Sequence, residues 1–222
     1  EAIFARVDRL EGIETLFDAY DRGLGLIFIS AHLGSPEVIA QALAPFGLNV
    51  VGVTEPLSPP RVHAFVDRVR RRHGMTYLPA DLGGLRAARA HLKHGGTLGL
   101  LVDRDVLGSG RAYPFFGAPA AMPTGAVDLA RRTGAEVVAG WVLRTRRPGR
   151  YHAWIEAVPL PPPTGDRAAD LDSGMGAVIA CLERAITRAP GQWFPLAPVW
   201  GPPAPPGDGG RDPYNRDRDH SS

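Results

Sequence analysis

Short apolar runs alternate with amphipathic segments along most of this chain, and that alternation limits the folds open to it. Apolar runs of strand length occupy residues 24–30, 49–54, 75–80, 97–102 and 135–144. Segments with apolar residues at helical spacing lie between them, at residues 7–23, 36–47, 59–74, 84–96 and 124–134. This order predicts helices on both faces of a sheet whose parallel neighbours are joined by right-handed crossovers.

The second half of the chain adds detail to this α/β prediction. Residues 151–158 alternate apolar and polar side chains, which is typical of a half-exposed antiparallel strand and makes the sheet mixed but mostly parallel. Residues 103–123 show no period and many Gly and Pro, so we expect a long ordered loop there. A last helix is predicted over residues 171–190. Residues 201–222 are too rich in Pro, Gly, Asp and Arg to bury much surface, so we expect one domain over 1–200 followed by a disordered tail.

The apolar positions of two segments predict which helix faces turn inward. In the first segment the helical face comprises Val7, Leu10, Ile13, Leu16 and Phe17. In the third segment the inward face comprises Val62, Phe65, Val66 and Val69.

Composition excludes several classes of protein. The single cysteine, Cys181, rules out an internal disulfide or a thiolate metal cluster and favours a reducing compartment and a core position. No apolar run approaches the roughly 18 residues that span a bilayer. The chain carries no G-x-S-x-G, G-x4-G-K-[ST], G-x-G-x-x-G or H-E-x-x-H motif, so serine hydrolase, nucleotide and zinc chemistry lose their usual support. We expect no metal, no bound cofactor and no nucleic-acid partner.

Arginine clusters occur at residues 68–72 and 144–150 in a chain of formal net charge +2. Such clusters usually form a solvated face, but they also suit phosphate groups or an anionic membrane surface.

The stretch "ISAHLGSPEVIAQAL" at residues 29–43 contains the strongest candidate for chemistry. His32 ends an apolar run, Ser35 and Pro36 are favoured at a helix start, and Glu37 falls in the first helical turn. A turn at Gly34 could bring the carboxylate against the imidazole, fixing its tautomer and leaving the other ring nitrogen as a base. The alternative is a polar joint between a strand and a helix.

A second acidic group, Asp103, also follows an apolar run. In a parallel sheet the carboxyl ends of the strands meet at one edge, where ligands bind. We therefore expect His32 and Asp103 to converge.

The chain resembles the bacterial lipid A biosynthesis acyltransferase family from about residue 7 to residue 200. The resemblance rests on "GLIFISAHLGSPE" with its H-x4-E motif, "RVRRRHG", "LKHGGTLGLLVDRD", "PFFGAPAAMPTGAVDLARRTGA" and the closing "QW". It implies a glycerolipid-acyltransferase-like, three-layer fold. The segments "DRD", "FFG" and "MPTGAVDLARRTGA" look closer to the phosphatidylinositol mannoside acyltransferases than to the lipid A branch.

The resemblance implies an O-acyltransferase that moves a fatty acyl group from acyl-CoA or acyl-carrier protein to a hydroxyl of a membrane glycolipid. His32 would be the general base and Glu37 its orienting partner. Backbone N–H groups near Gly34, or an arginine, would stabilise the oxyanion. Work at the cytoplasmic face of the bacterial inner membrane is implied, through peripheral contact or through an N-terminal segment that we expect to be missing here. Exposed aromatic residues could add membrane contact, with Trp193, Phe194 and Trp200 as the candidates.

The resemblance also implies substrate-binding residues. Arg70 and Arg104 would contact substrate phosphate or the oxyanion, and Asp103 would organise them or supply a second acid. The alternative is that Asp103 and Arg104 simply pair. Glu55, just past the second strand, would line the site.

One departure in the sequence and two alternative functions accompany this assignment. Many family members carry Asn and an aromatic residue where this chain has Ser35 and Pro36, which could alter the acceptor pocket. The same base could hydrolyse an acyl thioester with water as acceptor. A catalytically silent module that only binds lipid or acyl-carrier protein is the other alternative.

Overall fold

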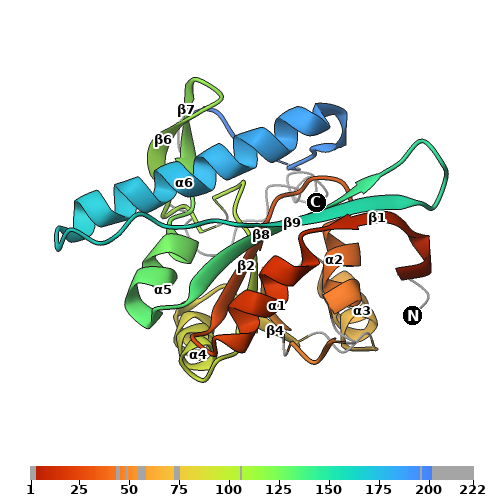
Figure 1. Ribbon diagram of the computed structural model, residues 1–222, viewed down its shortest axis with the longest axis horizontal. Coiled ribbons are helices and arrows are strands. Elements are labelled where there is room, and N and C mark those ends of the chain that lie inside the picture. The colour runs from red at the N-terminus through yellow and green to blue at the C-terminus, as the bar shows by residue number, and fades with distance from the viewer. Residues whose placement is uncertain are drawn as a thin grey trace, which may run out of the picture.

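A seven-stranded sheet forms the centre of the molecule in the computed structural model (Figure 1). The structure describes residues 4–43, 46–48, 50–54, 59–72, 76–105, 107–195 and 197–201. The strand order is β1-β9-β8-β2-β5-β3-β4. All neighbours pair in parallel except β8 and β9, which are antiparallel. The strands are β1 (Val7–Glu11), β2 (Leu26–Ser30), β3 (Val50–Thr54), β4 (Thr76–Pro79), β5 (Thr97–Leu101), β8 (Glu136–Arg144) and β9 (Tyr151–Ala157). The predicted mixed, mostly parallel sheet is confirmed.

Helices cover both faces of this sheet. They are α1 (Ile13–Asp21), α2 (Pro36–Leu43), α3 (Pro60–Arg72), α4 (Leu82–Lys93), α5 (Gly125–Thr133) and α6 (Arg167–Arg188), with short 3-10 turns at Phe4–Arg6 and Pro190–Gln192. Strand β2 shows the two faces clearly because its side chains alternate. Ile27 and Ile29 pack in a core with residues of α4, α5 and α6, whereas Leu26 and Phe28 pack with residues of α1 and α2. The α/β fold class is therefore confirmed.

The first predicted helix begins later than expected. Residues 7–11 form edge strand β1, which pairs with β9, so Val7 and Leu10 belong to a strand and not to the helix. Gly12 separates the two elements with a φ of 70°, and a Cβ there would lie 2.0 Å from the carbonyl oxygen of Ile155. Strand pairing with a distant segment has overridden the local helical spacing.

The predicted loop at residues 103–123 contains a β-hairpin, which corrects that expectation. Strands β6 (Arg111–Phe115) and β7 (Ala118–Met122) pair as a separate two-stranded sheet. Phe115, Ala120 and Met122 are buried, but two prolines and several small residues hide the alternation in the sequence.

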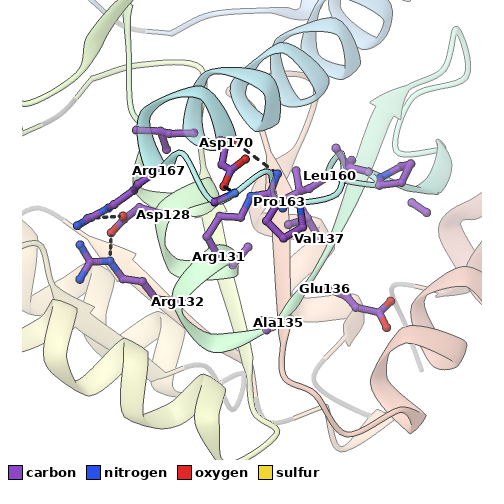
Figure 2. Close-up of a pocket in the computed structure, with 17 residues that line it drawn as sticks. Asp128, Arg131, Arg132, Ala135, Glu136, Val137, Leu160, Pro163, Arg167 and Asp170 are labelled. Atoms are coloured by element: carbon purple, nitrogen blue, oxygen red, sulfur yellow. Dashed lines mark hydrogen bonds and ion pairs between the residues drawn. The ribbon is translucent and has the colours of Figure 1, made fainter.

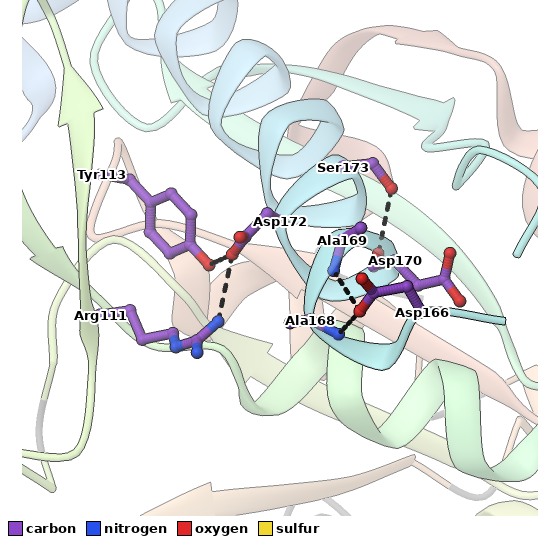
Figure 3. Close-up of polar contacts among 8 residues, drawn as sticks. All are labelled: Arg111, Tyr113, Asp166, Ala168, Ala169, Asp170, Asp172 and Ser173. Atoms are coloured by element: carbon purple, nitrogen blue, oxygen red, sulfur yellow. Dashed lines mark hydrogen bonds and ion pairs between the residues drawn. The ribbon is translucent and has the colours of Figure 1, made fainter. Parts of the chain in front are cut away.

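The hairpin is attached to helix α6 through polar contacts. The Tyr113 hydroxyl donates to Asp172 at 2.6 Å, and Arg111 reaches the same carboxylate at 3.2 Å (Figure 3). Asp166 caps the first turn of α6 by accepting from the backbone N–H groups of residues 168 and 169. These contacts hold the hairpin against the first half of α6.

Helix α3 is rotated relative to the expected orientation. Val62, Phe65 and Val69 were expected inward, yet they are 45%, 65% and 37% exposed. The side of α3 that turns toward the protein carries Arg70, which binds Glu37 of α2 and Thr54 of β3. These polar contacts hold the helix, and its apolar stripe is left at the surface.

Gly34 forms the turn between β2 and α2, and α2 begins at Pro36 as predicted. The φ of Gly34 is 68°, and a Cβ on Gly34 would lie 2.1 Å from the backbone oxygen of Val142. Because that oxygen belongs to a central strand, it cannot move aside cheaply.

We expect Gly34→Ala to lower the free energy of unfolding by about 2–5 kcal/mol, the sum of left-handed backbone strain and overpacking. Gly23→Ala is the matched control, because Gly23 also has a φ of 68° but nothing lies within 4 Å of its Cβ position. The control should cost only about 1–2 kcal/mol. Urea unfolding of both variants measures the difference, and equal losses would contradict the steric argument.

Candidate functional site

His32 and Asp103 meet at the carboxyl edge of the sheet, as expected from their positions. His32 follows β2 and Asp103 follows β5, and these two strands are direct neighbours. The Nδ1 atom of His32 lies 2.9 Å from Oδ1 of Asp103. A carboxylate that accepts from Nδ1–H leaves Nε2 with the lone pair, so the imidazole is prepared to act as a base.

Asp103 is fully buried, and three donors surround its carboxylate. The backbone N–H of His32 donates to Oδ2 at 3.0 Å, and the indole N–H of Trp193 donates to the same oxygen at 2.8 Å. The third donor is Nδ1–H of His32, on Oδ1. A charge removed from water requires such partners, since an unpaired buried carboxylate is strongly unfavourable.

The segment that carries Trp193 also lies against the backbone of the His32 turn. The N–H of Phe194 donates to the carbonyl of His32, and the N–H of Gly34 donates to the carbonyl of Gln192, both at 2.9 Å. The Gln192 side chain exchanges two further hydrogen bonds of 2.9 Å with the backbone of Arg144 at the end of β8. The turn is thus held by two segments far from it in sequence.

Glu37 does not orient His32 in this structure, which corrects the geometry expected from the H-x4-E spacing. Within the described part of the chain, its carboxylate accepts from Arg70 of α3, and Nδ1–H of His32 donates to Asp103 instead. The start of α2 directs Glu37 toward α3, and β5 delivers Asp103 directly beside β2. Two acids therefore serve two different cationic or basic groups at one edge of the sheet.

Arg70 is held on several sides. Besides Glu37, it donates to the Thr54 hydroxyl at 3.3 Å, and its guanidinium lies 4.3 Å from the ring centre of Tyr77. Burial raises the pKa of Tyr77 to about 12, and the charge of Glu37 adds to that rise. Tyr77 therefore stays a neutral aromatic surface for the cation near neutral pH.

The remaining predicted site residues are placed as follows. The backbone N–H groups of Gly34 and Ser35 donate to the carbonyls of Gln192 and Val142, so they are not available to an oxyanion. Arg104 is half-buried directly after Asp103. Glu55 lies outside the described residues. Trp193, a site residue that the prediction treated only as a membrane contact, was marked in the sequence by the closing "QW".

Two cavities lie away from this edge of the sheet. One of about 660 Å³ is bordered by the amino end of β8, the end of α5 and the start of α6, with Arg131 and Asp170 among its lining residues (Figure 2). The other, of about 640 Å³, lies between the hairpin turn at Phe116 and helix α6. Among the described residues, none of the predicted site residues His32, Glu37, Arg70, Asp103 and Arg104 lines either cavity.

Cys181 occupies the core, as predicted, and is fully buried in α6. Burial raises the pKa of this thiol to about 12, so the nucleophilic thiolate is scarce near neutral pH. Among the described residues, no cluster of His, Cys, Asp or Glu is arranged to hold a metal ion.

Residues 1–201 match the family of bacterial lipid A biosynthesis acyltransferases, and the chain belongs to this family. The mostly parallel α/β sheet agrees with the fold expected from the resemblance.

Two curated relatives are both named phosphatidylinositol mannoside acyltransferase. The protein of Mycobacterium tuberculosis strain H37Rv is 26% identical over 205 residues, covering 88% of this chain and 61% of the relative. The protein of Mycolicibacterium smegmatis is 26% identical over 200 residues, covering 85% of this chain and 60% of the relative. The chain thus spans about three-fifths of the length of these relatives. None of the described helices combines the length and apolar character needed to span a membrane.

We expect Cys181 to resist iodoacetamide in the folded protein at pH 8, because a pKa of about 12 leaves about one thiol in ten thousand ionised. In urea the same thiol should react readily, and mass spectrometry of the labelled chain measures both states. Rapid stoichiometric labelling of the native protein would contradict its burial and would admit a thioester on Cys181.

Proposed function

We propose that this chain is the catalytic part of a membrane-associated O-acyltransferase in which His32 is the general base. The observation that carries the proposal is the His32–Asp103 hydrogen bond at the carboxyl ends of two neighbouring parallel strands. The donor is an acyl thioester, acyl-CoA or acyl-carrier protein, and the acceptor is a hydroxyl of a membrane glycolipid. The names of the two relatives favour a phosphatidylinositol mannoside as acceptor over a lipid A precursor.

The reaction follows from the ring nitrogens of His32. Nε2 takes the proton of the acceptor hydroxyl as its oxygen attacks the thioester carbonyl carbon. Asp103, on Nδ1, stabilises the imidazolium that forms. The tetrahedral intermediate then collapses, the carbon–sulfur bond breaks, and the thiolate leaves with the proton held by His32. The products are the acylated lipid and a free thiol, and His32 is again neutral.

Glu37 and Arg70 have a binding role in this proposal. Glu37 and the Tyr77 ring hold the Arg70 guanidinium, whose side chain is 19% exposed, at the same edge of the sheet as His32. A fixed guanidinium suits the phosphodiester of an inositol phospholipid or the charge that develops on the thioester oxygen. Arg104 is a second candidate for this contact, next to Asp103 in the chain.

A thioester-release assay with an extracted lipid acceptor tests the catalytic assignment. We expect His32→Ala to abolish transfer, and Asp103→Asn to lower kcat by about 100- to 10,000-fold, as loss of a histidine-orienting carboxylate does in serine proteases. Glu37→Gln should mainly raise the KM for the phosphorylated acceptor, because it weakens the hold on Arg70.

Three outcomes of that assay oppose the proposal in different ways. Undiminished transfer by His32→Ala would overturn the base assignment. A larger loss of kcat in Glu37→Gln than in Asp103→Asn would return the orienting role to Glu37. Free fatty acid as the main product with acceptor present would identify a thioester hydrolase instead.

The exposed stripe of α3 supports peripheral contact with a membrane, which we assign to the cytoplasmic face of the bacterial inner membrane. Val62, Phe65 and Val69 form the apolar stripe, and the exposed Arg61 and Arg68 lie along one side of it. A helix with this division can insert its apolar side chains at the headgroup boundary while the arginines bind anionic lipids. Since α3 also holds Arg70, the membrane would lie near the candidate phosphate contact.

We expect replacement of Val62, Phe65 and Val69 together by Ser to weaken binding to vesicles of phosphatidylcholine with phosphatidylinositol by about 30-fold, from the lost apolar burial. Leu10→Ser/Leu24→Ser is the control, because Leu10 and Leu24 are 39% and 53% exposed outside α3. Co-sedimentation measures both. Equal vesicle binding by the α3 variant and the intact chain would contradict the role of this surface in membrane contact. Loss of vesicle binding in Phe194→Ser/Trp200→Ser alone would assign the contact to the closing segment, residues 192–200.

A further inference from the structure

We propose that Trp193 is a positioning residue of the acyl-transfer site, whose indole N–H keeps the Asp103 carboxylate aligned on Nδ1 of His32. This inference rests on the proposed function for its kinetic consequence, but its structural core concerns one hydrogen bond. The role differs from the membrane contact expected of this tryptophan from the sequence.

The two oxygens of Asp103 are used differently, and this division is the basis of the proposal. Oδ1 faces Nδ1 of His32 at 2.9 Å, whereas Oδ2 accepts from the Trp193 indole at 2.8 Å and from the His32 backbone at 3.0 Å. With Oδ2 fixed by two donors in different directions, rotation of the carboxylate is restricted and Oδ1 stays on the ring. Removing the indole N–H leaves one donor on Oδ2 and a carboxylate that can pivot.

Burial makes this hydrogen bond difficult to replace. Asp103 is 0% exposed, so bulk water does not reach the carboxylate to take the place of the lost donor. A buried carboxylate with one donor fewer is left with an unsatisfied oxygen, and it can turn away from Nδ1 of His32 to find another partner. The imidazole would then lose the fixed tautomer and orientation that a general base needs.

Trp193 is itself held firmly enough to position another group. Its backbone forms an isolated antiparallel bridge with Leu33, the residue next to His32. Its ring meets Phe115 edge-on with centroids 5.9 Å apart, and Trp200 in the same manner at 5.6 Å. The indole is thus fixed by backbone and ring contacts before any substrate binds.

Trp200 provides a matched control inside the same aromatic cluster. Its indole N–H donates to the backbone carbonyl of Phe115 at 3.0 Å, and its ring stacks on the Phe115 ring. Replacing either tryptophan by Phe removes one indole N–H and part of one ring from this cluster. Trp193→Phe removes a donor to Asp103, whereas Trp200→Phe removes a donor to a backbone oxygen.

The experiment compares Trp193→Phe with Trp200→Phe in acyl transfer and in proton NMR without substrate. We expect Trp193→Phe to lower kcat by about 10- to 100-fold with KM little changed. Loss of a group that hydrogen-bonds to a metal ligand has an effect of this size in metalloenzymes. Trp200→Phe keeps an aromatic ring at the candidate membrane contact and should lower kcat much less than Trp193→Phe does. The low-field Nδ1–H resonance of His32, assigned by its absence in His32→Ala, should weaken or shift in Trp193→Phe alone.

A second replacement guards against a folding defect in Trp193→Phe. Incorporation of 3-benzothienylalanine at position 193 keeps the shape of indole but replaces N–H by sulfur, and we expect it to give the same NMR change with an unaltered melting temperature. An unchanged His32 resonance in this variant would overturn the proposal, whatever the chain catalyses. An altered resonance without any acyl transfer in the intact chain would instead reject the proposed function and keep the hydrogen-bond role.

Discussion

The candidate site depends on the hydrogen bonds that the buried carboxylate of Asp103 accepts. This carboxylate lies outside the reach of solvent and is stabilised by donors from the turn after β2 and from the closing segment. A hydrogen bond to a charged group typically contributes about 1.5–3 kcal/mol, and here two of them join separate segments through one side chain. The parallel pairing of β2 with β5 brings the carboxylate to this point, since both strands end at the same edge.

A second polar cluster at the same edge has a separate task. Glu37, Arg70, Thr54 and Tyr77 come from α2, α3, β3 and β4, and together they hold a guanidinium with little freedom. This arrangement pairs Glu37 with Arg70 and Asp103 with His32, although the spacing of His32 and Glu37 in the sequence suggests one pair. It also explains why α3 turns a polar side toward the protein and leaves Val62, Phe65 and Val69 exposed.

Much of the fold could be predicted because the local pattern and the global structure agree. Strand β2 is buried throughout and apolar up to Ser30, and the turn after it carries Gly34 and Pro36 where the backbone requires them. The convergence of His32 and Asp103 followed from strand direction alone. The expectation failed where distant contacts decide the outcome: β1 pairs with β9, and the hairpin at residues 111–122 conceals its alternation behind prolines.

Both Glu37 and Asp103 were expected near His32, but which of the two acids accepts from its imidazole could not be predicted for the same reason. Sequence spacing reports only how far Glu37 is from His32 along the chain, whereas the partner is chosen by strand adjacency and by the direction of α2. Trp193 is more distant still, and nothing in its neighbourhood in the sequence points to Asp103. Only the folded chain shows that an aromatic residue near the end of the chain donates a hydrogen bond at the site.

The docking of the closing segment on the His32 turn has a consequence for biosynthesis. A ribosome makes the chain from the amino end, so β2, His32 and Asp103 emerge long before Gln192, Trp193 and Phe194. Until residues 192–194 have been made, the backbone of the turn lacks its hydrogen bonds to them, and Oδ2 of Asp103 lacks the indole N–H of Trp193. A growing chain therefore holds an incomplete candidate site until this segment has been made.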